Sequence, residues 1–298
     1  MRVGILGGGL QGCCVALSLA ERGIKVTLFD RNEQLLSRTA IANEGKVHLG
    51  YMYANDPSHS TARLMLQEAL AFAPFFTRHL GLAKDSMTVS RPAAYVVHRD
   101  SQRTPEQVSR YLTIVHALIR EASEGRSDAY FGRDLSDEPR MWSAAQREAE
   151  FDPEVALAAF DTPEVAIDPV ALAGALRDRI GADRRIDIRL NHKVLSVEDA
   201  DTLEVALESS SGAIRERFDH VVNALWDGRF AINENRGLRP NRPWLHRLKY
   251  GVSFRLPAGA NLPPSATFVS GPFGEVVSYG DGLTYTKSHL SEPVRPLA

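Results

Sequence analysis

The sequence predicts an α/β protein in which a Rossmann-like dinucleotide-binding domain is interleaved with an α+β domain built on an antiparallel sheet. Three observations support this prediction. Residues 2–31 have the order strand, glycine turn, helix, strand and acid, the order of a dinucleotide-binding βαβ unit. A second buried strand of the same kind follows far along the chain, within 218–224. Alternating runs between 230 and 285 then predict several antiparallel strands.

The glycines of the first stretch follow the spacing G-x-G-x-x-G directly after the apolar strand Val3–Leu6. Gly7 permits the tight turn out of the strand, Gly9 lets a pyrophosphate approach the backbone, and Gly12 lets the following helix lie close to the sheet. The helix N-terminus presents free N–H groups and a partial positive charge to phosphates. This stretch therefore predicts a bound dinucleotide.

An acidic residue ends the second strand of the unit. Asp30 lies 18 residues after Gly12 (30 − 12), where its carboxylate can accept hydrogen bonds from a ribose 2′-OH and would repel a 2′-phosphate, so NADP is disfavoured. Two alternatives are a signal-peptide core, against which the spaced glycines and second strand argue, and a fold that has lost its ligand. The residues predicted to bind the dinucleotide here are Gly7, Gly9, Leu10, Gln11, Gly12, Asp30 and Arg31.

Composition places the chain among ordinary globular proteins. Its 298 residues are 44% hydrophobic and 24% charged, with a formal net charge of −2, so nothing indicates a nucleic-acid partner. No apolar run approaches the roughly 20 residues of a membrane span. The two cysteines, Cys13 and Cys14, are adjacent, which excludes a disulfide framework and a zinc site. We expect no metal, and a reduced, cytoplasmic setting.

The remaining elements follow from apolar periodicity and turn signals. Helices are predicted over 58–80, from Thr104 as N-cap with Pro105 and Gln107 completing a capping box, and from Asp168 through Ile180. Strands are predicted at 47–51, 93–97, within 154–166, at 186–190, 193–198, 203–207, 213–218 and 221–222, and then at 248–255, 266–269, 275–279 and 283–285.

The glycine fingerprint, Asp30 and the segment Asn43-Glu-Gly-Lys-Val-His-Leu-Gly50 together resemble the FAD-dependent amine and amino-acid oxidoreductases, the superfamily of D-amino-acid oxidase and glycine oxidase. The resemblance implies that Asn43, Glu44, Gly45 and His48 lie near FAD, since in that family this segment runs past the pyrophosphate toward the flavin ring. It also implies that the Val194 backbone meets the adenine, and that Asn223 and Ala224 end a strand that returns beside the glycine turn. This second return favours FAD over NAD.

The resemblance also implies the domain organisation. A Rossmann-like FAD-binding domain would comprise 1–57 and 183–229, a substrate domain would comprise 58–182 and 230–285, and 286–298 would form an irregular tail. Family members continue past this point with a segment that stabilises reduced flavin. The sequence stops at Ala298, so we expect a member that lacks this segment, with weaker FAD binding and catalysis.

The expected activity is hydride transfer from a C–N bond of a small-molecule amine or amino acid to flavin N5, a reaction in which the cofactor carries the chemistry. Three residues are candidates for a catalytic or substrate-binding role: His48, Tyr250 and Arg255. Guanidinium and phenol donors suit a substrate carboxylate. The alternatives are a hydrogen-bonded histidine, a packed tyrosine and an ion-paired surface arginine. An inactive dinucleotide-binding member and an NAD-dependent dehydrogenase remain as other functions, and the oligomeric state is open.

Overall fold

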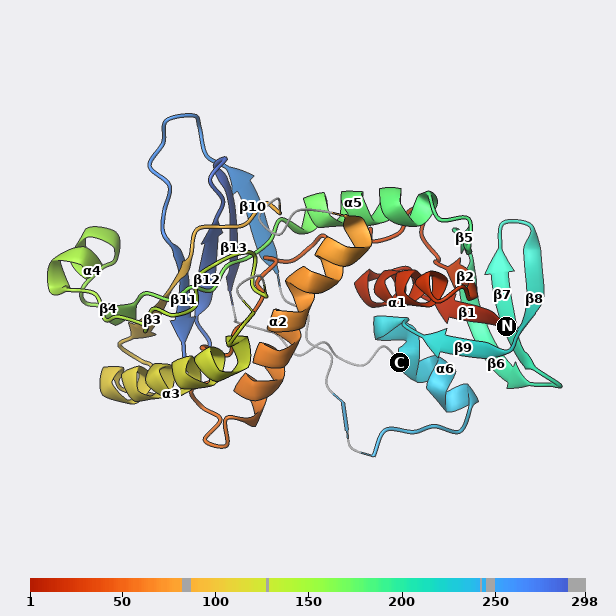
Figure 1. The fold of residues 1–298 in the computed structure, drawn as a ribbon, viewed down its shortest axis with the longest axis horizontal. Helices are drawn as coiled ribbons and strands as arrows, with labels where there is room; N and C mark the ends of the chain where they lie inside the picture. Colours follow the sequence, from red (N-terminus) through yellow and green to blue (C-terminus); the bar gives the residue numbers. More distant parts are fainter. Residues whose placement is uncertain (82–86, 127–128, 242, 245–249, 289–298) are drawn as a thin grey trace. The chain divides into compact units, whose positions relative to one another are not determined.

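The computed structural model describes residues 1–81, 87–126, 129–241, 243–244 and 250–288 (Figure 1). The chain divides into two compact units, each made of two separate stretches. Unit 1 comprises residues 1–43 and 169–244, and unit 2 comprises residues 44–168 and 245–298. The chain thus passes from one unit to the other after residues 43, 168 and 244. The sequence-based division instead places these boundaries after residues 57, 182 and 229.

Unit 1 is organised around a four-stranded parallel sheet of order β5-β2-β1-β9, next to which Figure 1 shows α1 and α5. The strands are β1 (Arg2–Leu6), β2 (Lys25–Phe29), β5 (Ile186–Arg189) and β9 (His220–Asn223), and the helices are α1 (Leu10–Glu21) and α5 (Pro169–Gly181). The two central strands, β1 and β2, are buried at four of their five positions, as expected for parallel strands covered on both faces. The predicted Rossmann-like fold is confirmed.

A three-stranded antiparallel sheet completes unit 1. It has the order β6-β7-β8, with β6 (Lys193–Asp199), β7 (Leu203–Ser209) and β8 (Gly212–Phe218), and a tight turn between Ser209 and Gly212 joins the last two. After β9 the chain forms the 3-10 turn η1 (Trp226–Gly228) and α6 (Arg229–Asn235). The core between these elements is apolar and consists of Leu6, Phe29, Val197, Val205, Leu207, Phe218 and Ile232.

Unit 2 contains a six-stranded sheet of order β10-β13-β12-β11-β3-β4. Its strands are β3 (Ala93–His98), β4 (Ala156–Phe160), β10 (Gly251–Arg255), β11 (Ser265–Val269), β12 (Gly274–Ser278) and β13 (Leu283–Ser288). All neighbouring pairs are antiparallel except β11 with β3, which is parallel. The predicted antiparallel sheet is therefore correct apart from this one pair, which joins segments about 170 residues apart in sequence.

The described part of unit 2 also contains three helices, two of which the sequence predicts. They are α2 (Ser60–Leu80), α3 (Pro105–Ser123) and α4 (Ala144–Glu150). The capping box predicted at Thr104 is present: its hydroxyl accepts from the Gln107 N–H at 3.3 Å, and the Gln107 side chain accepts from the Thr104 N–H at 3.0 Å. Ser143 caps α4 in the same way, a helix that the polar composition of 123–152 did not indicate.

Two segments differ from the sequence-based prediction. Residues 47–51 form no ladder: Lys46 makes one isolated bridge with Ala166, and the Leu49 N–H donates to a carboxylate instead of a neighbouring strand. Strand β13 continues to Ser288 into the predicted irregular tail, because Lys287 and Ser288 pair with Glu275 and Gly274 of β12. Residues 289–298 and the first part of the predicted strand 248–255 lie outside the described residues.

Candidate functional site

The glycine turn of unit 1, Gly7–Gly12, is closed on one side by its own backbone and open on another. Gly7 has a φ of +102°, and a Cβ there would lie 2.6 Å from the Ala224 carbonyl oxygen. A Cβ on Gly12 would lie 1.9 Å from the Gly7 carbonyl oxygen. Around the Cβ position of Gly9, no atom of the described residues lies within 4 Å. Gly7 and Gly12 are thus required by the fold, whereas Gly9 leaves room for a ligand.

The open space adjoins the N-terminus of α1. Gly9 is the N-cap residue and provides no side-chain cap, and the first turn contains no acidic residue. The first hydrogen bond of the helix runs from the Cys13 N–H to the Gly9 carbonyl at 3.0 Å, so the preceding N–H groups of Leu10, Gln11 and Gly12 face the helix end. Free N–H groups and the helix dipole at this position suit a pyrophosphate.

Asp30, the predicted ribose acceptor, already accepts three hydrogen bonds within unit 1. Its Oδ2 accepts from the Gly8 N–H at 2.7 Å, and its Oδ1 accepts from the Asn32 N–H at 2.8 Å and the Asn32 Nδ2 at 2.7 Å. Asp30 therefore orders the glycine turn itself. An ionised carboxylate has about four acceptor positions, so one remains for a ribose hydroxyl.

An ion cluster lies beside the glycine turn. The Asp227 carboxylate pairs with Arg31 at 3.2 Å and with Arg38 at 3.3 Å. The segment before Arg38 contacts the turn directly, since the Leu36 N–H donates to the Gly8 carbonyl at 2.8 Å. All three charged side chains are about half exposed, so their pairing is weak and can exchange with other ions. Sequence reasoning identified Arg31 but not Arg38 or Asp227.

The other residues predicted around the cofactor in unit 1 have partners within that unit. The Ala224 N–H donates to the Leu6 carbonyl at 2.8 Å, which places Ala224 beside the glycine turn as predicted. The Asn223 amide donates to the Arg229 carbonyl at 3.0 Å and shapes the turn into α6. Asn43 donates to the Thr39 carbonyl at 2.8 Å. Val194 pairs with Leu207 in the antiparallel sheet.

In unit 2, four buried or nearly buried charges form a cluster that we call the charged centre: Glu44, Lys46, Glu275 and Lys287. Lys46 Nζ lies 2.9 Å from Glu275 Oε2, and Lys287 Nζ lies 2.7 Å from Glu275 Oε1. Burial alone would raise the pKa of Glu275, but the two ammonium groups hold this pKa below its ordinary value. Lys287 also pairs with Glu44, so the four charges balance.

Gly45 lies in the charged centre for a reason unrelated to a ligand. Its φ is +72°, and a Cβ there would lie 1.9 Å from the Ile167 carbonyl oxygen. The two segments run against each other, since the Ile167 N–H donates to the Gly45 carbonyl at 2.9 Å and the Val47 N–H to the Val165 carbonyl at 3.1 Å. Gly45 thus allows segment 44–47 to pack against segment 165–167. This packing alone explains why position 45 is a glycine.

The same packing brings the His48 ring within hydrogen-bond distance of the fully buried Glu164 carboxylate. His48 Nδ1 lies 2.9 Å from Glu164 Oε1, and the Leu49 N–H donates to Glu164 Oε2 at 2.8 Å. The Tyr95 hydroxyl also donates to Glu164. Burial of Glu164 acts to raise its pKa, but His48, Lys46 and Tyr95 more than offset this effect, so the pKa of Glu164 is below its ordinary value.

The two remaining candidates lie near β10. Tyr250 is 75% exposed. Arg255 is also exposed, and its Nη1 lies 2.6 Å from Asp281 Oδ2 and 3.0 Å from the Asp281 carbonyl. A substrate carboxylate at Arg255 would therefore have to replace Asp281.

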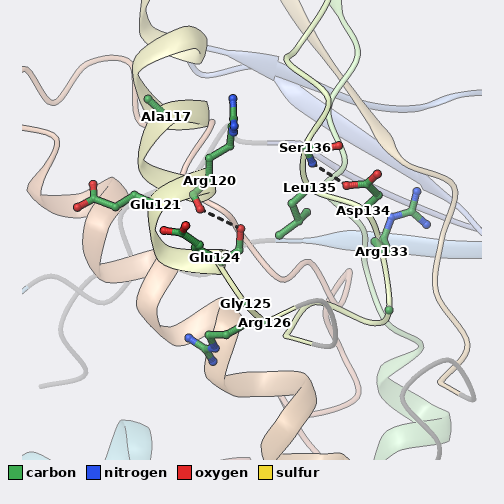
Figure 2. A pocket seen from close by; sticks show the side chains of 12 residues that line it. Ala117, Arg120, Glu121, Glu124, Gly125, Arg126, Arg133, Asp134, Leu135 and Ser136 are labelled. Carbon is green, nitrogen blue, oxygen red and sulfur yellow. Dashed lines mark hydrogen bonds between the residues drawn. The ribbon is translucent and has the colours of Figure 1, made fainter.

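A surface groove of about 830 Å³ lies between the C-terminal end of α3 and residues 132–136, and Figure 2 shows the side chains that line it. Its lining carries both signs of charge, with Arg120 and Arg133 opposed by Glu124 and Asp134. None of the predicted site residues lines it. Such a mixed lining favours no single class of charged ligand.

Across the described ranges, His, Cys, Asp and Glu side chains nowhere gather in threes or more as a metal site would require. Of the helices in those ranges, none combines the length and hydropathy that a membrane crossing requires.

Comparison with known proteins agrees with the geometry of the glycine turn. The family model described as DAO, FAD-dependent oxidoreductase, matches residues 2–282. The chain belongs to this family. FAD is accordingly the cofactor, and the residues present fit it: an open Gly9, uncapped N–H groups on α1 and a free acceptor position on Asp30.

Solved structures of family members share the fold of this DAO-family chain. Glycine oxidase from Geobacillus kaustophilus is 18% identical with a TM-score of 0.66, and the match covers 99% of this chain and 73% of that one. Iminodiacetate oxidase from Chelativorans sp. BNC1 is 17% identical with a TM-score of 0.66, covering 98% and 72%.

Curated relatives match over shorter stretches. The FAD-dependent monooxygenase FPY4 of Fusarium mangiferae is 38% identical over 66 residues, which are 22% of this chain and 17% of that protein. The glycerol 3-phosphate oxidase of Mycoplasma pneumoniae is 41% identical over 46 residues, which are 15% and 12% of the two chains. The matched stretches thus span under a fifth of these relatives.

Proposed function

We propose that this DAO-family protein oxidises the C–N bond of a small amine or amino acid. When bound, FAD would supply the redox chemistry as the acceptor of a hydride from the substrate carbon, and the protonated imine so formed would be hydrolysed by water. The protein's contribution is to bind and orient both molecules. The observation that carries the proposal is the family match over residues 2–282, supported by a glycine turn whose open side suits a pyrophosphate.

Within this proposal the N–H groups of Leu10, Gln11 and Gly12 hold the pyrophosphate, and Asp30 accepts the ribose hydroxyl. Arg31 and Arg38 can exchange Asp227 for the phosphate charge, because their pairs with it are exposed. We place His48 at the substrate, because the family resemblance implies that it lies near FAD. An amine that reaches the site in its neutral form needs no further proton acceptor, so His48 would orient such a substrate through a hydrogen bond.

A second candidate function is oxidation of a C–OH bond. A hydroxyl must lose its proton as the carbon loses hydride, and this step needs a proton acceptor. His48 Nε2 is available for that role, since Nδ1 is held by Glu164. The local match to a glycerol 3-phosphate oxidase supports this candidate. The two candidates differ in whether turnover depends on a proton acceptor.

The test is anaerobic bleaching of the flavin. Purified protein is loaded with FAD, its visible spectrum is recorded, and glycine, other amino acids, secondary amines, 2-hydroxy acids and glycerol 3-phosphate are added in turn. Loss of the oxidised flavin bands with amines alone supports C–N oxidation. Bleaching by hydroxy compounds alone replaces that proposal with the second candidate.

Two further outcomes would overturn both candidates. A spectrum that lacks flavin bands even with excess FAD, combined with tight NADH binding in a fluorescence titration, would indicate an NAD-dependent protein. FAD binding without bleaching by any of these classes would indicate a dinucleotide-binding member without this activity.

A further inference from the structure

The His48 side chain is held by a carboxylate from a distant part of the chain. His48 lies on the extended segment after the charged centre, and Glu164 lies 116 positions later. Glu164 is 0% exposed, whereas the His48 side chain keeps 20% exposure. One nitrogen of the ring is therefore fixed inside unit 2, and the ring is still partly accessible.

Glu164 is surrounded by donors that keep it ionised. Its two oxygens receive the Leu49 N–H and the Tyr95 hydroxyl in addition to the His48 ring. A buried carboxylate without such donors would be neutral. Its pKa is instead lowered, and Lys46 contributes to this. An ionised carboxylate can only accept, so at neutral pH the ring nitrogen at 2.9 Å must carry the proton.

The backbone on both sides of this pair is fixed by tyrosines. The Tyr130 hydroxyl donates to the Val47 carbonyl at 2.7 Å and accepts from the Val165 N–H at 3.0 Å, so it joins the segments before His48 and after Glu164. The Tyr111 hydroxyl donates to the Gly50 carbonyl at 2.8 Å. The distance between the His48 and Glu164 backbones is thus fixed independently of their own hydrogen bond.

With Nδ1 protonated, a neutral imidazole has Nε2 as its acceptor. Among the residues that the structure describes, none forms a hydrogen bond with His48 Nε2. The groups that face the pair are Lys46, on the Glu164 side, and the side chains of five tyrosines: Tyr51, Tyr53, Tyr95, Tyr111 and Tyr130. Burial raises the pKa of Tyr53 to about 12, so Tyr53 stays neutral beside the ring.

We propose that Glu164 is a positioning residue: it fixes His48 as the Nδ1–H tautomer and thereby presents Nε2 as a hydrogen-bond and proton acceptor. The assignment of that acceptor to substrate rests on the proposed function, but the tautomer itself does not. This distinction allows the two claims to fail separately.

The test is ¹⁵N NMR of histidine side chains in the FAD-loaded, full-length protein at a pH where the ring is neutral. The chain has nine histidines, and His48→Asn assigns the signal. We expect His48 to be the Nδ1–H tautomer in the parent protein, and Glu164→Gln to shift it to the Nε2–H form. A parent protein with His48 as the Nε2–H tautomer would overturn the proposal, whatever its activity.

Two variants separate positioning from folding. Glu275→Gln also removes a buried carboxylate of unit 2, but this carboxylate has no contact with His48, so the tautomer should not change. If Glu164→Gln does not fold, Glu164→Asp keeps the charge but shortens the side chain by one methylene group, so the carboxylate no longer reaches Nδ1 and the Nε2–H fraction should rise measurably. An unchanged tautomer in every folded Glu164 variant would also overturn the proposal.

Turnover then tests the proposed function separately. If His48 accepts a proton from substrate, Glu164→Gln should lower kcat roughly 10- to 100-fold with little change in KM, because general-base catalysis contributes about 10²–10⁴-fold. His48→Asn should lower kcat at least as much. Full activity in His48→Asn would remove His48 from the proposed reaction, while the tautomer measurement would still decide the role of Glu164.

Discussion

In unit 1 the groups predicted to hold the pyrophosphate lie within six consecutive positions, Gly7–Gly12, whereas two ion pairs of the charged centre in unit 2, Lys46 with Glu275 and Glu44 with Lys287, join residues more than 200 positions apart. The glycine turn offers a ligand its backbone N–H groups and the space that absent side chains leave. The charged centre is held together by ion pairs between long side chains in the interior of unit 2. Replacing a glycine of the turn therefore adds atoms at one place only. Removing a charged side chain from the charged centre leaves its ion-pair partner buried without a counter-charge.

This difference sets how each region tolerates substitution. A Cβ on Gly7 or Gly12 would meet neighbouring backbone, whereas a Cβ on Gly9 would enter open space. A charge in the charged centre has partners on other strands, and its loss leaves a buried ion uncompensated. The following predictions test this comparison, from the largest expected effect to the smallest.

The largest effect is expected from Lys46→Ala. Removing this ammonium leaves Glu275 with Lys287 alone, and breaking a buried pair from one side costs about 3–5 kcal/mol. Urea unfolding should show this loss in the free energy of unfolding. The exposed Arg255→Ala, which breaks a surface pair with Asp281, is the matched control and should cost about 1 kcal/mol or less. Equal losses would mean that burial does not distinguish the charged centre.

Gly12→Ala should have the next largest effect. The new Cβ would lie 1.9 Å from the Gly7 carbonyl oxygen, and backbone must move to accept it. Overpacking of this kind costs about 1–3 kcal/mol, and FAD binding should weaken with it. Thermal unfolding and an FAD titration measure the two effects. Gly174→Ala in α5, whose Cβ would meet no neighbour within 4 Å, should instead stabilise by about 0.5–1 kcal/mol.

Acid should weaken unit 2 through its depressed carboxylates. Glu275 and Glu164 have pKa values below their ordinary 4.5. Their stabilisation is therefore fully present above pH 4.5 and is lost as the pH falls toward their folded values. Urea unfolding from pH 7 to pH 3 should show a falling free energy of unfolding below pH 4.5. Glu275→Gln should be less stable at pH 7 and should have a shallower slope; an unchanged slope would contradict the assignment.

The smallest effect on the fold is expected from Gly9→Ala. Its Cβ would enter space that no described residue occupies, so the melting temperature should change by little. The Kd for FAD should rise about tenfold or more, which corresponds to about 1.4 kcal/mol, because the methyl group occupies the pyrophosphate position. If FAD affinity stays unchanged, the open side of the glycine turn is not where the pyrophosphate lies.

The same comparison explains what the sequence could predict. Gly7, Gly9, Gly12 and Asp30 form a contiguous pattern in which each residue has a local reason, so the parallel sheet and its helix could be predicted without knowledge of any distant contact. His48 could be proposed from the family resemblance. Its partner could not, because periodicity carries no information on which of the 37 acidic residues a ring will meet.

A local signal for Glu164 nevertheless exists. It is followed directly by three buried apolar residues, Val165, Ala166 and Ile167. A charged residue in such surroundings must find partners or become neutral, so its burial and function are linked. Glu275 has the same signal, since Val276 and Val277 follow it. Arg38 and Asp227 carry no such signal, because they are exposed.

The interleaving of the two units also determines the order in which their parts leave the ribosome. Every strand of unit 1 has been made once residue 223 is synthesised, although 125 residues of unit 2 (44–168) are translated in between. Strands β10–β13 follow only at 251–288, so Lys46 and Glu44 emerge more than 200 residues before Glu275 and Lys287. At about 5–20 residues per second, these two charges wait at least ten seconds in solvent for their partners. The strands of unit 1 are therefore synthesised before unit 2 is complete. The last two strands of unit 2, β12 and β13, carry Glu275 and Lys287, which balance the charges of Lys46 and Glu44.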